Sequence, residues 1–273
     1  MNVLSCRGHE LPIGDRTIIM GILNVTPDSF SDGGSYNQVE TALRKAHQMV
    51  AEGVDIIDIG GESTRPGAAT VGAEEELQRV IPVIEAIRRE INVPISIDTY
   101  KAVVAKQALE SGAHIINDVW GGQADSEMAA VAAAYDCSFI ITHNRTSSEY
   151  VEFLPEVISD LQRYTNDAIQ AGVKPEHIIL DPGIGFAKSY QQNLYLMNNL
   201  RTIVELGYPV LLGTSRKSVI GLTLGLPPEE RLEGTAATVA LGIAQGCGIV
   251  RVHDVQAIKR LAVMTDAIIR SSH

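Results

Sequence analysis

The stretch 51–63, "AEGVDIIDIGGES", shows in one place the pattern that decides the fold. A helical pattern ends at Gly53, and a short apolar run then ends at Asp58, before a pair of glycines. Glycine after a helix is typical of a left-handed C-cap. A short run dominated by isoleucine is typical of a strand buried on both faces, as parallel strands are. The stretch therefore predicts a helix followed by a parallel strand whose end is polar.

The same pattern recurs along the chain in "ESGAHIIND", "QAGVKPEHIILDPG", "ELGYPVLLGTS" and "AQGCGIVRVHD". Three further strands fit residues 17–25, 93–98 and 137–143, which makes eight. Eight β-α units within ~250 residues predict an α/β fold of the (β/α)8 TIM-barrel type. The alternative is a doubly wound open sheet, which would predict an early G-x-G-x-x-G turn after a strand. The sequence has no such turn.

Helical patterns lie between the predicted strands. Two apolar helix faces are formed by Val157, Leu161, Tyr164 and Ala168, and by Leu194, Met197, Leu200 and Val204. No linker or low-complexity tract interrupts the pattern, so we expect a single domain over residues 1–273. Gly8 and Gly14 flank "HELPI" before the first barrel strand, which predicts an N-terminal hairpin closing the bottom of the barrel.

The composition limits the class of protein. Hydrophobic residues make up 45% and charged residues 20% of the chain, as in soluble globular proteins. The apolar runs are shorter than the ~20 residues of a membrane helix, and the polar opening predicts no signal sequence. The net charge of −11 argues against a general nucleic-acid binder. Three distant cysteines, at 6, 137 and 247, indicate neither a disulfide framework nor a zinc site, and we expect a cytoplasmic protein.

The ends of the predicted strands carry the candidate chemistry, because the active site of this fold lies at the C-terminal ends of its strands. In chain order these ends hold Asn24, Asp58, Asp98, Asn117, His143, Asp181, the segment 213–218, and Arg251 with His253. Any one polar residue there could simply cap a following helix, and Asp98 before "TYK" is such a case. Eight polar ends converging on one mouth instead indicate a binding site.

The residue types suggest two kinds of ligand group. A carboxylate beside an amide suits a heterocycle that offers N–H and NH₂ donors along one edge. Cations follow the seventh and eighth strands, where barrels of this type often hold phosphate. These cations are Arg216, Lys217, Arg251 and His253.

Three residues near the mouth allow narrower interpretations. The carbonyl oxygen of Asn24 could be one ligand of Mg²⁺, which prefers a few protein oxygens together with phosphate and water. Phe186 lies in a glycine-rich loop and would either form a wall for a flat substrate or anchor the loop. His143 is expected to order its loop rather than to bind a ligand.

Eight segments together resemble the dihydropteroate synthase family over about residues 17–255, in the order and spacing typical of the family. They are "MGILNVTPDSFSDGG", "DIGGESTRPGA", "SIDTYK", "INDVWG", "THNR", "LDPGIGFAKS", "GTSRKSVIG" and "RVHDV". The resemblance implies a pterin-binding TIM barrel that condenses 6-hydroxymethyl-7,8-dihydropterin pyrophosphate with 4-aminobenzoate, giving 7,8-dihydropteroate and pyrophosphate. It also implies a requirement for Mg²⁺ and a homodimer formed through late helices.

The resemblance implies roles for single positions as well. The pterin positions are Asp98, Asn117, Asp181 and Lys217. The pyrophosphate positions are Arg251 and His253, supported by Arg65 and by Asn24, which also takes the metal position. The 4-aminobenzoate positions are Thr64, Pro66, Phe186 and Ser218. Thr142 stands where many members have Met, and Ala187 stands where Gly is frequent, so both bear on affinity rather than on catalysis.

A dissociative reaction would need no protein nucleophile. If pyrophosphate leaves before the amine attacks, the pterin methylene becomes a cation that an aromatic amine can attack unaided. Asp32 could stabilise this cation, while Lys217, Arg251 and His253 neutralise the leaving group. Two alternatives are a methyltransferase-type pterin-binding barrel and a non-catalytic pterin-binding paralogue. The first would lack "TPDSFSDGG", and the second would be expected to lose Asn24, Lys217 or Arg251, all of which are present.

Overall fold

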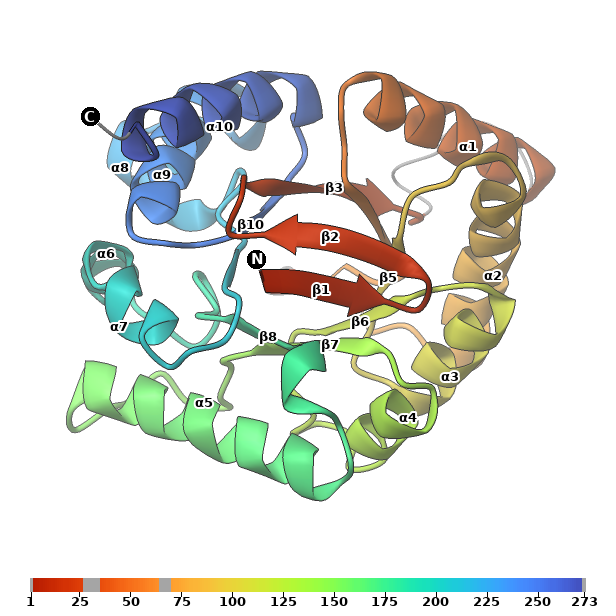
Figure 1. Cartoon of the computed structure of the whole chain (residues 1–273), viewed down its shortest axis with the longest axis horizontal. Helices are drawn as coiled ribbons and strands as arrows, with labels where there is room; N and C mark the ends of the chain where they lie inside the picture. The colour runs from red at the N-terminus through yellow and green to blue at the C-terminus, as the bar shows by residue number, and fades with distance from the viewer. Residues whose placement is uncertain (1, 27–34, 64–69, 272–273) are drawn as a thin grey trace.

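The structure is a computed structural model that describes residues 2–26, 35–63 and 70–271. Its centre is a ring of parallel strands, surrounded by helices (Figure 1). The strands are β3 (Ile18–Asn24), β4 (Ile56–Gly60), β5 (Ile95–Asp98), β6 (Ile115–Asp118), β7 (Ser138–Thr142), β8 (Ile178–Asp181), β9 (Leu211–Leu212) and β10 (Ile249–Val252).

Hydrogen bonding joins these strands in the order β8-β7-β6-β5-β4-β3-β10-β9. The ring closes between its two ends, where a parallel bridge joins Leu180 of β8 to Val210, just before β9. The Leu180 amide there donates to the Pro209 carbonyl at 2.9 Å. The predicted (β/α)8 TIM barrel is therefore confirmed.

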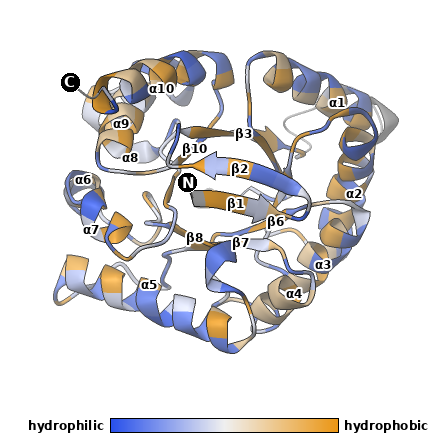
Figure 2. Ribbon diagram, viewed as in Figure 1, coloured by the Kyte–Doolittle hydropathy of each residue, from blue (hydrophilic) through white to orange (hydrophobic). Residues whose placement is uncertain are grey.

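Strand β4, from the stretch that decided the fold, is buried at all five positions. Its isoleucines pack inward against the barrel interior and outward against helices, because successive side chains of a strand point to opposite faces. In Figure 2 the central strands are mainly apolar, and the helices around them alternate apolar with hydrophilic residues. The core is therefore two nested layers.

The helices of the outer layer follow the strands in the expected alternation. They are α1 (Ser35–Ala51), α2 (Ala73–Glu90), α3 (Ala102–Ser111), α4 (Met128–Ala134), α5 (Phe153–Gln170), α6 (Tyr190–Asn198), α7 (Leu200–Val204), α8 (Ser218–Leu224), α9 (Leu232–Ala244) and α10 (Val255–Ile269). Two short 3₁₀ turns lie at Pro175–His177 and Pro228–Glu230. Among the described residues, none of the helices combines the length and the apolar character needed to cross a membrane.

The first predicted helix face is confirmed and the second is wrong. Helix α5 buries Val157, Leu161, Tyr164 and Ala168 together. The second face is split, because the chain breaks at Asn199 between α6 and α7. Leu194 is 43% exposed there, while Leu196 takes the buried position.

The predicted N-terminal hairpin is present and consists of β1 (Asn2–Cys6) and β2 (His9–Ile13), paired antiparallel. Its tight turn places Arg7 and Gly8 at positive φ, as two-residue hairpin turns require. The inward side chains form an apolar cluster with the first residues of the barrel strands. The cluster contains Leu4, Cys6, Leu11, Ile13, Ile18, Met20, Ile56, Ile115, Ile140, Ile179, Leu211 and Ile249. The hairpin thus fills the N-terminal end of the barrel, and Figure 1 shows it lying across that end.

All three cysteines lie in the described part of the chain, and each is buried and free. Burial raises the pKa of the Cys6 thiol to about 11 and the pKa of the Cys137 and Cys247 thiols to about 12. These thiols are core side chains, in agreement with the absence of a disulfide pattern in the sequence.

Candidate active site

The C-terminal ends of the strands surround a cavity of about 550 Å³. The predicted site residues that line it are Asn24, Asp98, Asn117, Asp181, Phe186, Lys217, Ser218, Arg251 and His253, and Thr142 lies in the same wall. The ring closure brings these residues together from most of the strand ends. The positions Asp32, Thr64, Arg65 and Pro66 lie outside the described residues.

A second cavity of about 540 Å³ lies near the hairpin end of the barrel, beside α7, α9 and the end of α10. Two of its lining residues, Arg201 and Arg270, donate hydrogen bonds to the backbone carbonyls of Ala244 and Gly14. No carboxylate is among the described residues that line it. The chemistry predicted from the strand ends is concentrated in the first cavity.

Arg251 on β10 joins two carboxylates at the floor of this cavity. Its Nε donates to Asp58 Oδ2 at 2.6 Å, and its Nη2 donates to Asp98 Oδ2 at 2.6 Å. Asp58 is fully buried, and the Asn117 amide lies 3.3 Å from its Oδ2. A buried charge is stable only when it is paired, so the guanidinium and Asp58 require each other.

Asp98 is the carboxylate of this group that remains available to a ligand. Burial raises its pKa to about 7, with the negative charge of Asp58 adding to the effect and Arg251 opposing it. Its Oδ1 is buried and has no hydrogen-bond partner among the described residues. A ligand donor would satisfy this oxygen, which fits an N–H or NH₂ group of a heterocycle.

Asp181 and Lys217 form the opposite side of the floor. Burial raises the pKa of Asp181, and its Oδ1 accepts a hydrogen bond from the Gly183 amide at 2.7 Å. Burial lowers the pKa of Lys217 to about 8, against the attraction of Asp181. The Lys217 ammonium donates to the Ile184 carbonyl and lies 4.0 Å from the centre of the Phe186 ring. Phe186 therefore stands at the cavity with a cation against its face.

The segment after β9 places a serine beside His253. Ser215 Oγ lies 2.9 Å from His253 Nδ1 and also accepts a bond from the His253 backbone amide at 3.2 Å. Arg216, a candidate phosphate ligand from the sequence, also lines the cavity and makes two bonds to Asp254, at 2.5 and 3.1 Å. The cations nearest the floor are thus Lys217 and Arg251, with His253 beside them.

Asn24 ends β3 and lines the cavity. Its amide and carbonyl oxygens are the hard type of ligand that Mg²⁺ prefers. Among the described residues, no cluster of three His, Cys, Asp or Glu side chains could hold a metal. A cation at Asn24 would therefore need further oxygens from its ligand, as a pyrophosphate provides.

The loop between β8 and α6, residues 182–188, is built for a close approach to the neighbouring loop. Gly183 has φ +71, and a Cβ at this position would lie 1.9 Å from the His143 carbonyl oxygen. Ala187 has φ 44, a left-handed conformation that strains a residue with a Cβ. The position at which the sequence departs from the family pattern is thus one where glycine would be relaxed.

His143 lies under this loop and is fully buried. Its Nδ1 lies 2.8 Å from the Lys188 ammonium, and its Nε2 lies 3.3 Å from Asp160 Oδ2. Burial lowers the pKa of His143 to about 3, and the charge of Lys188 adds to the effect. The imidazole is therefore neutral and holds the loop, as the sequence suggested.

Sequence reasoning placed Asp58 and the segment containing Ser215 at strand ends without a specific partner and did not single out Lys188, and the structure places all three in or beside the site. Asp58 had a signal, because it ends a strand as Asp98 does. Lys188 and Ser215 had only their positions in motif segments after β8 and β9, and a partner for either could not be read from spacing.

Comparison with known proteins finds matches over nearly the whole chain. The family described as pterin binding enzyme matches residues 20–253. The dihydropteroate synthase of Clostridium beijerinckii is 57% identical over 262 residues, covering 96% of this chain and 97% of the relative. The dihydropteroate synthase of Bacillus subtilis is 56% identical over 267 residues, covering 98% and 94%.

Solved structures agree as well. A Clostridium difficile dihydropteroate synthase determined in the presence of pteroic acid superposes with a TM-score of 0.93 at 53% identity, covering 96% of this chain and 100% of that chain. The Xanthomonas albilineans enzyme with 4-aminobenzoic acid gives a TM-score of 0.95 at 39% identity, covering 99% of each chain. With both the sequence and the arrangement of the strands matching over nearly their full length, this chain belongs to the dihydropteroate synthase family of pterin-binding enzymes.

Proposed function

We propose that the cavity binds 6-hydroxymethyl-7,8-dihydropterin pyrophosphate and 4-aminobenzoate and joins them into 7,8-dihydropteroate, releasing pyrophosphate. The observation that carries this proposal is the floor, where Asp98, Asn117 and Asp181 meet Lys217 and Arg251 in one cavity. A pterin has a guanidine-like edge, and carboxylates accept paired hydrogen bonds from such an edge. The solved relatives with pteroic acid and 4-aminobenzoic acid support the same two classes of ligand.

Arg251 would change partners during binding. Its Nη2 now bonds to Asp98 Oδ2, the carboxylate that we assign to the pterin. Pterin donors would compete with the guanidinium for this carboxylate, while Asp58 Oδ2, 2.6 Å from both Nε and Nη2, keeps the guanidinium in place. The N–H of Nη2 that is released from Asp98 could then donate to a pyrophosphate oxygen. Recognition of the pterin would in this way prepare the cation that its leaving group needs.

The reaction breaks the bond between the pterin methylene carbon and the pyrophosphate oxygen, which keeps the electron pair. The amine nitrogen then forms the new bond to carbon and loses a proton. Lys217, Arg251 and His253 neutralise charge that develops on the leaving oxygens. Mg²⁺ bound by Asn24 and the pyrophosphate would stabilise the same charge as a Lewis acid.

Release of pyrophosphate tests the activity directly. Purified protein supplied with both substrates and Mg²⁺ should release pyrophosphate, and chelation of the metal should stop release. The released pyrophosphate can be hydrolysed by a coupled pyrophosphatase, and the phosphate that forms can be measured. Pterin binding without any release would instead favour the non-catalytic paralogue.

We further propose a dissociative order of bond breaking and assign Asp32 to the cation that this order creates. An Asp32→Ala variant should lose turnover by at least ~100-fold, the size of a single electrostatic contribution to a transition state. Its affinity for the pterin pyrophosphate should stay near that of the wild type, because Asp98, Asn117 and Asp181 are intact. Turnover and calorimetric binding measured on the same preparation check both parts. Unchanged turnover would refute the role.

A homodimer and a cytoplasmic location complete the proposal. Helices α9 and α10 pack side by side and expose apolar side chains. This α9–α10 patch consists of Leu241, Val263, Met264 and Ile268, each about 60% exposed. A second copy of the chain would cover it, since contiguous exposed apolar side chains are typical of interaction sites. The free cysteines support a reducing compartment.

A further inference from the structure

We propose that Lys188 is a positioning residue that fixes the β8–α6 loop, residues 182–188, and through it the wall against which 4-aminobenzoate packs. The inference rests on the proposed function, since it concerns the second substrate of that reaction. It assigns Lys188 no contact with substrate. Its role is to hold Phe186 and the acceptor of Lys217 in place.

The contacts of the Lys188 ammonium carry the argument. It donates to His143 Nδ1 at 2.8 Å, to the Gly183 carbonyl at 3.0 Å and to the Phe186 carbonyl at 3.1 Å. A lysine ammonium has three donors, and these are its three nearest acceptors, with the His143 carbonyl oxygen farther away at 3.4 Å. The side chain thus closes the loop on itself, from its last residue back to its second and fifth.

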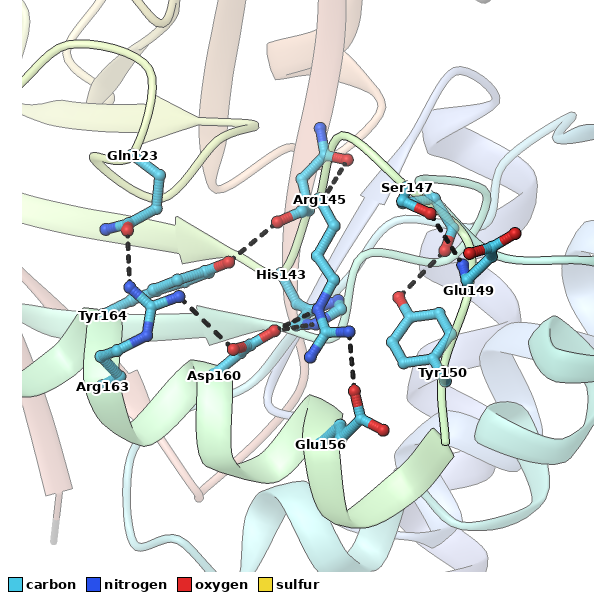
Figure 3. Close-up of polar contacts among 12 residues, drawn as sticks. Gln123, His143, Arg145, Ser147, Glu149, Tyr150, Glu156, Asp160, Arg163 and Tyr164 are labelled. Atoms are coloured by element: carbon cyan, nitrogen blue, oxygen red, sulfur yellow. Dashed lines mark hydrogen bonds and ion pairs between the residues drawn. The ribbon is translucent and has the colours of Figure 1, made fainter. Parts of the chain in front are cut away.

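The acceptor His143 is itself held in one orientation. Its Nε2 faces Asp160 on α5, and Asp160 also accepts from Arg145 Nε at 2.5 Å. Arg145 in turn bonds to Glu156 at 2.8 Å. Figure 3 shows this network between the loop after β7 and helix α5. The Lys188 ammonium therefore joins the β8–α6 loop to a rigid frame outside the cavity.

Three other polar groups of the loop are bonded to neighbouring side chains. Asn193 on α6 accepts from the Gly185 amide at 2.6 Å and donates to the Lys188 carbonyl at 3.2 Å. Tyr150 donates its hydroxyl to the Ala187 carbonyl at 2.9 Å. The Ile184 carbonyl is left to face Lys217, which is the bond seen in the structure. Loss of the Lys188 ammonium would remove the side-chain donor of the Phe186 carbonyl and of the imidazole at once, while the Gly183 carbonyl would keep only its bond from the Phe186 amide.

The two substrate regions depend on this loop to different degrees. Asp98 and Asn117 lie on β5 and β6 and make no bond to the loop among the contacts of the described residues. Two other pterin positions do contact the loop, because the Gly183 amide donates to Asp181 Oδ1 and the Ile184 carbonyl accepts from Lys217. Phe186, in contrast, is part of the loop itself. Because the bonds of Asp98 and Asn117 are independent of the loop, its displacement should weaken 4-aminobenzoate binding more than pterin binding.

The test compares Lys188→Met with wild type and with Lys174→Met, which removes an exposed lysine paired with Asp136 at 2.8 Å. Wild-type turnover reports on the proposed function itself. Binding of a sulfonamide, a mimic of 4-aminobenzoate, is measured by calorimetry and needs no turnover. We expect Lys188→Met to raise the KM for 4-aminobenzoate and the sulfonamide Kd at least tenfold. The pterin Kd should change less than threefold, and Lys174→Met should match wild type.

Unchanged sulfonamide affinity in Lys188→Met would overturn the proposal, and so would an equal loss of pterin and sulfonamide affinity. If Lys188→Met does not fold, Tyr150→Phe decides, because it keeps the ring and removes one bond to the same loop. Its sulfonamide Kd should rise two- to threefold at constant pterin affinity. The absence of that rise would count against positioning by the loop.

Discussion

At the scale of single residues, His143 is a buried imidazole kept neutral by its surroundings. Burial and the adjacent Lys188 lower its pKa to about 3 from an ordinary value of 6.5. On acidification His143 is therefore protonated in the unfolded chain but stays neutral in the folded chain. This residue makes the fold less stable as the pH falls from 6.5 toward 3.

A His143→Gln variant should show this effect as a change in pH dependence. Between pH 6 and 4, His143 should lower the free energy of unfolding of the wild type by up to ~1.4 kcal/mol per pH unit. The variant lacks this contribution, so its stability should approach that of the wild type as the pH falls. Urea unfolding at several pH values measures the difference, and parallel curves would contradict the assignment.

Arg251 shows what sequence reasoning could and could not reach at this scale. Its place at a strand end predicted that it lines the mouth, and the cavity confirms this location. Its partner Asp58 lies 193 positions earlier, and the two meet only because β10 pairs with β3 and β3 with β4. Two strand-end aspartates look alike in the sequence. That Asp58 and Asp98 both bond to the guanidinium depends on the closed ring.

At the scale of elements, the β8–α6 loop contains one position that only glycine can occupy and one non-glycine residue in a strained backbone conformation. Gly183 is required by the nearby His143 carbonyl, whereas Ala187 occupies a left-handed conformation without needing to be alanine. Such a conformation costs a non-glycine residue ~1–2 kcal/mol, while glycine adds disorder to the unfolded chain worth ~0.4–1 kcal/mol. The difference between the two effects favours glycine, which should raise the free energy of unfolding.

Ala187→Gly should therefore stabilise the protein by about 0.5–1 kcal/mol. The matched control is Ala130→Gly in helix α4, where glycine should cost about 1 kcal/mol because the backbone is helical. Thermal or urea unfolding of both variants measures the effect. A loss of stability in both would mean that residue 187 is not strained.

The element boundaries show a second limit of the sequence. The apolar spacing of Leu194, Met197, Leu200 and Val204 fits one continuous helix, yet α6 ends at Asn198 and α7 begins at Leu200. Periodicity reports which residues share a face and says little about a break between two helices. The capping box at Ser189 and Gln192 that starts α6 was the more local signal.

At the scale of the whole molecule, the exposed α9–α10 patch should hold two copies together. A double variant, Met264→Asp with Ile268→Asp, places charge on one stripe of α10, because residues four apart share a helix face. It should shift the protein from dimer to monomer in sedimentation velocity. Val151→Asp puts one negative charge on a residue that is 97% exposed in a loop, and should leave the dimer intact. A wild type that sediments as a monomer would contradict the proposal.

The order of helices and strands made the barrel predictable, because eight repeats of one unit have few alternative arrangements. The hairpin was predictable from two glycines, but how far its side chains reach into the barrel was not. That depth follows from the apolar cluster it forms with strand residues spread over the chain, such as Ile56, Ile140 and Ile249.

Because the hairpin fills one end of the barrel, ligands must enter and leave the cavity by the other end. The ligand that lies deeper must therefore bind first. A pterin held at Asp98 would bind before an aminobenzoate held at Phe186, and the product would leave by the same path. A compound that occupies only the outer part of the cavity would therefore block binding of the pterin and also slow the dissociation of a pterin that is already bound.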